Sequence, residues 1–115
     1  MAIPKWMRDE CIIGIGLNLA DRDRFDEAIT YFDGAIEGDP ENARLYFFRG
    51  RIKREAGLAS RERISSIYDA YPVYKNTPQS KQYFRASLED YEKAMELYGS
   101  QDDAETTGGR KNGNT

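Results

Sequence analysis

The chain has 115 residues, of which 39% are hydrophobic and 32% charged, and this suggests one globular domain with a thin core. It has no histidine and a single cysteine, Cys11, so it lacks the usual parts of metal sites and acid–base catalysis, and we expect no enzyme activity, metal or cofactor. The net charge of −3 has interleaved signs, no long apolar run exists and no secretory signal opens the chain, so we expect a cytoplasmic protein with no membrane partner.

Two amphipathic helices are predicted in the first part of the chain. The first begins at Pro4, whose missing N–H is tolerated in a first helical turn, and runs to about Ala20. A charged turn follows. The second helix spans about Phe25 to Glu37, because apolar residues recur there every three or four positions. The Gly-Asp-Pro sequence after it ends the helix.

A third, strongly basic helix begins near Glu41 or Asn42 and runs to Ala56, where Gly57 closes it. Ser60 then suits the N-cap of a short amphipathic helix that Pro72 ends. This short helix is predicted because its apolar side chains are spaced by three, four and seven positions. Those side chains are Ile64, Ile67, Tyr68 and Tyr71.

The last helix is predicted to start at Thr77, as N-cap, and Pro78, as first helical residue, and to end at about Tyr98, before Gly99. The segment 100–115 is polar and nearly free of apolar side chains. We therefore expect an all-α domain over residues 1–99 and a disordered polar tail over 100–115.

An internal repeat underlies these helices. Gly16 and Gly50 lie 34 positions apart, and each is flanked by residues at the same helical spacing. The second helix carries alternating aromatic and small residues, and the last helix repeats this spacing. Phe25, Ala28, Phe32 and Ala35 return as Phe84, Ser87, Tyr91 and Ala94, each 59 positions later. The second shift exceeds the first by 25 positions, which indicates an insertion between the two helices of the second unit.

This pattern resembles the tetratricopeptide repeat (TPR), a 34-residue unit of two antiparallel helices. The resemblance implies antiparallel helix pairs stacked as a short TPR-type superhelix. Repeat 1 would span about 9–42 and repeat 2 about 43–57 plus 83–99, with the insertion at about 58–82. Arg49 and Lys53 depart from the pattern, because the family usually has apolar residues there.

The resemblance also implies protein binding, because the first helices of successive TPR units line a concave groove. The groove positions carried over to this chain are Ile13, Leu17, Arg44, Phe47, Arg51 and Arg54. The last four share one helix face, and arginines on both sides of an aromatic residue suit carboxylates or phosphorylated residues. We predict an interaction module (an adaptor, an escort or a small subunit) that binds an acidic or phosphorylated segment.

Two alternatives remain for the basic helix. It is either a solvated charged face whose arginine stems cover apolar surface, or a nucleic-acid contact made by Arg44–Arg54. The acidic remainder of the chain argues against nucleic acid as a partner.

The insertion holds a second candidate interface, formed by Ile64, Ile67, Tyr68, Tyr71 and Tyr74. Tyrosine is enriched at interfaces, although the same residues can instead form a lid over the repeat core. About three repeats are usually needed for stability, and this chain has two. Apolar surface on the last helix therefore lacks a neighbouring repeat, and we expect a partner or a homo-oligomer to cover it. That surface comprises Leu88, Met95 and Tyr98.

Overall fold

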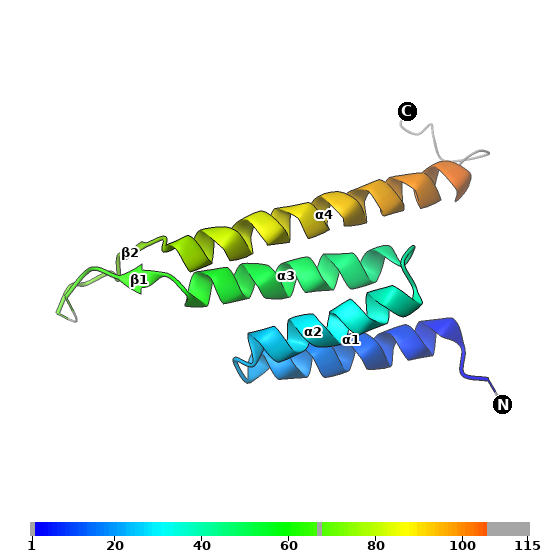
Figure 1. Cartoon of the computed structure of the whole chain (residues 1–115), viewed down its shortest axis with the longest axis horizontal. Helices are drawn as coiled ribbons and strands as arrows, with labels where there is room; N and C mark the ends of the chain where they lie inside the picture. Colours follow the sequence, from blue (N-terminus) through cyan, green and yellow to red (C-terminus); the bar gives the residue numbers. More distant parts are fainter. Residues whose placement is uncertain (1, 67, 106–115) are drawn as a thin grey trace.

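In the computed structural model, which describes residues 2–66 and 68–105, successive helices run antiparallel to one another (Figure 1). The helices are α1 (Lys5–Asp21), α2 (Phe25–Gly38), α3 (Ala43–Ala59) and α4 (Pro78–Glu105). Each helix packs on the next along the chain, and α1 also contacts α3. The predicted all-α class is confirmed.

Local side-chain chemistry starts the two later helices. The Asn42 side chain accepts a hydrogen bond of 3.1 Å from the backbone N–H of Arg44, which caps α3. At α4, Thr77 and Ser80 exchange hydrogen bonds, since each side-chain oxygen accepts from the other residue's backbone N–H, at 3.0 and 2.7 Å. This is a reciprocal capping arrangement, and it agrees with Thr77 as the predicted N-cap.

Two helices run past the glycines that were expected to end them. α3 continues through Gly57 to Ala59, and Gly57 is buried against the ring of Phe84 on α4. Gly57 is therefore a close-packing position and not a helix stop. α4 continues through Gly99 to Glu105, so residues 100–105 of the expected disordered tail are helical, whereas 106–115 lie outside the described residues. A single glycine inside a helix costs only about 1 kcal/mol relative to alanine. Because no proline directly follows Gly57 or Gly99, each helix continues past its glycine.

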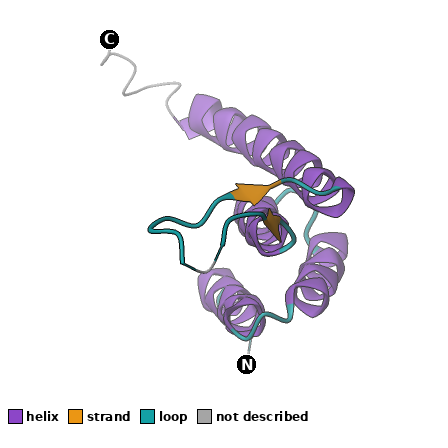
Figure 2. Cartoon of the chain, turned by 90° about the vertical axis from the view of Figure 1, so that its left-hand side faces the viewer, coloured by secondary structure: helices purple, strands orange, loops and turns teal. Residues whose placement is uncertain are grey.

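The predicted short helix around Tyr68 is wrong. The chain instead forms two short antiparallel strands, β1 (Glu62–Arg63) and β2 (Tyr74–Lys75). The strands and the described residues between them, 62–66 and 68–75, form an arm that projects past the ends of α3 and α4 (Figures 1 and 2). Serine side chains compete with a helix for backbone groups here: the Ser65 hydroxyl accepts from the N–H of Val73 at 2.9 Å.

The core lies among α1, α2 and α3. Phe32 is fully buried at its centre, against Gly16, with the other buried side chains arranged around it. These are Ile13, Ala20, Ala28, Ile36, Leu45 and Ile52. α4 packs on α3, and there the Ser87 hydroxyl donates a 2.7 Å hydrogen bond to the carbonyl of Gly50. The expected packing of the helix from Phe84 onward against the helix that carries Gly50 is confirmed.

Candidate functional site

An aromatic side chain stands exposed in the middle of α3. Phe47 is 40% exposed, although it lies on the largest helix–helix contact of the molecule. Its ring contacts Phe48 edge to face, with 5.1 Å between the ring centroids, and it contacts Tyr91 of α4 at a centroid distance of 5.6 Å. Such a supported ring is rigid and offers apolar contact area without a large loss of side-chain entropy on binding.

The arginines that share the face of Phe47 differ in how far they are already paired. Arg44 binds Glu10 of α1 at 2.8 Å, so its charge is largely balanced within the chain. Arg51 is exposed and makes a long 3.4 Å contact to Glu55 one turn away. Arg54 is exposed and forms no ion pair with another described residue. The available positive charge therefore lies on the C-terminal side of Phe47.

The α1 side of the predicted groove is less open than the TPR resemblance implied. Ile13 is buried and belongs to the core, so it offers no surface to a partner, and its expected place in the groove is wrong. Leu17 is partly buried against the same core. The reason is that α1 and α3 pack against each other as well as against α2, which draws this side of α1 inward.

One residue that the sequence did not place in the site, Tyr91, contributes to it. Tyr91 was identified only as a scaffold residue, yet its ring supports Phe47. Glu10 pairs with Arg44, and Lys5 pairs with Asp39 at 2.9 Å; in each pair the two residues are 34 apart. Opposite charges 34 positions apart, the spacing that also separates Gly16 from Gly50, were a usable signal for these two contacts.

The second candidate interface lies on the arm. Ile64, Tyr68, Tyr71 and Tyr74 are exposed, and Ile67 lies outside the described residues. Tyr74 lies beneath the guanidinium of Arg61, 4.7 Å from its ring centroid. Because these side chains are exposed, the arm does not act as a lid on the helical core. Its exposed aromatics remain a surface for contact.

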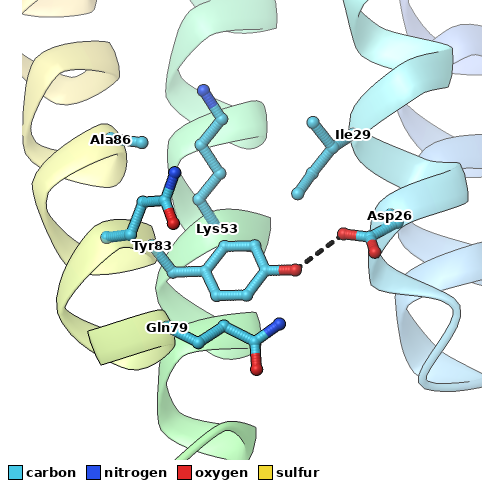
Figure 3. A pocket seen from close by; sticks show the side chains of 7 residues that line it. Asp26, Ile29, Lys53, Gln79, Tyr83 and Ala86 are labelled. Atoms are coloured by element: carbon cyan, nitrogen blue, oxygen red, sulfur yellow. Dashed lines mark hydrogen bonds between the residues drawn. The ribbon is translucent and has the colours of Figure 1, made fainter. Parts of the chain in front are cut away.

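A small cavity of about 270 Å³ opens between α2, α3 and α4 (Figure 3). Its walls carry the Asp26 carboxylate, the Lys53 stem, two glutamines and Tyr83, whose hydroxyl donates a 2.7 Å hydrogen bond to Asp26. This bond and burial raise the pKa of Tyr83. The Lys53 ammonium is bound to Asp90 at 3.1 Å. Asp26, Lys53 and Tyr83 therefore already have partners, and the hydrogen bond from Tyr83 to Asp26 links α4 to α2.

No helix within residues 2–66 and 68–105 is long and apolar enough to cross a bilayer. In the same part of the chain, no three acidic or cysteine side chains converge as metal ligands would. No family model, curated protein or solved structure matches the chain, so a functional assignment has to rest on its own residues and geometry.

Proposed function

We propose that this chain is a protein-interaction module, an adaptor or a small subunit of a larger assembly, that binds an acidic or phosphorylated segment on α3. The observation that carries the proposal is the exposed Phe47, held by Phe48 and Tyr91, with Arg51 and Arg54 on the same helix face. Phe47 would take an apolar anchor of the partner, and the two arginines would take its carboxylates or phosphates.

The positions of the charges support an acidic protein segment over nucleic acid. Arg49 and Lys53 point into the α3–α4 contact and bind Asp90, and Arg44 binds Glu10. On α3, two arginines remain with weak or no ion pairs to other described residues, which is too few for the many phosphate contacts that a nucleic-acid surface on this helix would need. The net charge of −3 points the same way.

A cytoplasmic location would suit this function. Cys11 is exposed and unpaired, and a reducing compartment keeps such a thiol from oxidising.

The proposal can be tested on an array of short synthetic peptides that carry one apolar residue among glutamate, phosphoserine or lysine. We expect the full chain to retain the acidic and phosphorylated peptides and not the lysine peptides. The double variant Arg51→Glu, Arg54→Glu should weaken that binding by roughly tenfold or more, because electrostatic attraction to the peptide becomes repulsion. Phe47→Ala should weaken it too, by removing the anchor site.

Lys81→Glu is the matched control, since Lys81 is an exposed cation of α4 outside this surface. It changes the net charge by the same amount per substitution and should leave peptide binding unchanged. Equal retention of acidic and basic peptides, or equal loss in the control and in the arginine variants, would show that α3 is not the binding surface. If the peptide test supports the proposal, cellular proteins captured by the wild type but not by the Arg51→Glu, Arg54→Glu double variant would identify the natural segment.

A further inference from the structure

The contact of α2 with α3 shows how one helix pair of this chain receives the next. On α2, Asp33 binds Arg49 of α3 at 2.8 Å. Ile29, one turn before Asp33, is packed against the core, and Ile36, one turn after it, is buried. On α3, Leu45 and Ile52 on either side of Arg49 are both buried. The covered face of α2 is thus Ile29, Asp33, Ile36, and that of α3 is Leu45, Arg49, Ile52.

α4 has the same face with nothing on it. The residues 59 positions after Ile29 and Ile36, the spacing that relates the two helices, are Leu88 and Met95. Leu88 is 57% and Met95 70% exposed. Among the described elements α4 packs on α3, apart from one side-chain hydrogen bond from Tyr83 to Asp26 of α2, and both contacts leave Leu88 and Met95 exposed. α4 therefore carries an apolar docking face equivalent to the one that α2 buries.

α1 carries the complementary face, also uncovered. The residues 34 positions before Leu45, Arg49 and Ile52 of α3 are Cys11, Ile15 and Asn18. Ile15 is 50% exposed, and Cys11 and Asn18 are exposed as well. At Gly14, an added Cβ would meet nothing within 4 Å, and a shallow hollow of about 480 Å³ lies over this part of α1. α1 thus presents an apolar side chain beside a hollow, where α3 presents the surface that receives α2.

We propose that a second copy of this chain fills each of these faces: α4 of one copy docks on α1 of the next in the manner of α2 on α3. Met95 or Leu88 would enter the hollow over Gly14, beside Ile15 of the neighbouring copy. The two faces are different surfaces of one chain, so the association is head-to-tail and does not close on itself as a symmetric dimer does.

A second copy fits better than an unrelated helix because both halves of the contact are present on the same chain, at the spacings that relate α1 to α3 and α2 to α4. The ion pair is not repeated, since Glu92 stands where Asp33 is and Ile15 where Arg49 is. The contact is therefore apolar, with Glu92 turned to solvent, and one helix face is a small interface. These features predict weak, reversible association that grows with concentration.

The test is sedimentation velocity of the full chain from about ten micromolar to about one millimolar, the range in which small interfaces associate. We expect the average mass of the wild type to rise with concentration and to pass that of a dimer. Ile15→Asp, which blocks the α1 face, and Met95→Asp, which blocks the α4 face, should each be monomeric. An equimolar mixture of the two should form a one-to-one dimer and nothing larger, because each variant keeps one intact face.

Tyr68→Asp on the arm is the matched control, since it puts the same charge on another exposed apolar side chain. It should associate as the wild type does. Gly14→Gln on the α1 face and Leu88→Asp on the α4 face are second variants, and each should also be monomeric. Circular dichroism at low concentration checks that each variant is folded.

A wild type that stays monomeric throughout would overturn the proposal. So would a Met95→Asp monomer combined with an Ile15→Asp dimer, which indicates a symmetric α4–α4 contact. A mixture that fails to form the one-to-one dimer, or a Tyr68→Asp control that loses association, contradicts it equally. The Arg51→Glu, Arg54→Glu double variant should self-associate as the wild type does. Failure of the self-association proposal can therefore be distinguished from failure of the peptide-binding proposal.

Discussion

The guanidinium of Arg49 on α3 donates two hydrogen bonds to the carboxylate of Asp90 on α4, from Nε at 2.8 Å and from Nη2 at 2.7 Å. Lys53 adds a third contact to the same carboxylate at 3.1 Å. Asp90 is only 4% exposed, and its carboxylate raises the pKa of Arg49. One buried acid thus compensates two basic residues that lie in the contact between α3 and α4.

Asp90→Ala should therefore be among the most destabilising substitutions in the chain. It leaves two half-buried cations without their shared partner, and removing one member of a buried pair costs roughly 3 kcal/mol or more. Chemical denaturation followed by circular dichroism measures the loss. The control is Glu89→Ala, the exposed neighbouring acid, which should change the free energy of unfolding by less than about 0.5 kcal/mol. Similar losses for both would mean that the cluster contributes no more than a surface charge.

Gly16→Ala tests the close contact between α1 and α2. An alanine Cβ would overlap the ring of Phe32, which is fully buried and has no room to move. Such overpacking costs about 1–3 kcal/mol. Gly34→Ala is the matched change on α2, where an added Cβ meets nothing within 4 Å, and it should stabilise the chain by up to about 1 kcal/mol. Thermal melts of the two variants should shift in opposite directions, and a shift in the same direction would contradict the close contact.

Tyr83 should ionise at a higher pH than a tyrosine does in an unfolded chain. Its pKa is raised first by the hydrogen bond to Asp26 and then by burial. The folded-state pKa lies above the unfolded one, so this bond contributes its full stability below the ordinary value of 10.0 and loses it as the pH rises through the raised pKa.

An absorbance titration of tyrosinate measures this effect. Tyr83→Phe should remove a component that titrates above the ordinary value of 10.0, and Asp26→Asn should move that component to lower pH. If the titration curve keeps its late component in Tyr83→Phe, another tyrosine is responsible.

The arm should be dispensable for folding. Its aromatic side chains are exposed, and the strands pair with each other rather than with a helix. Replacing residues 64–73 with a two-residue Asn-Gly turn should leave the cooperative melt and its midpoint nearly unchanged. The same replacement with a longer glycine–serine loop controls for strain in the turn. A large drop in midpoint with both loops would show that the arm stabilises the helices.

The regular parts of this molecule followed from the sequence. Apolar periodicity predicted the first two helices, because burying one stripe of a helix demands that spacing. Helix start signals predicted the third helix and most of the fourth. The recurrence of Gly16 as Gly50, and of Phe25 as Phe84, predicted which helices pack together. The N-cap at Thr77 was predictable as well, since capping is a local interaction between neighbouring residues.

Tertiary contacts decided the rest. Whether Gly57 ends a helix or admits a neighbouring ring depends on Phe84, which is distant in sequence. The sequence marked Arg49 as a departure from the repeat pattern, but only the fold shows that Asp90 binds it in a buried cluster, whereas Arg54 stays exposed. The apolar spacing around Tyr68 predicted a short helix, but this part of the chain forms paired strands instead. The reason is that a short helix is stable only when its apolar side packs on a core, and the arm has no core to pack on. In each case the deciding interaction joins residues that only folding brings together.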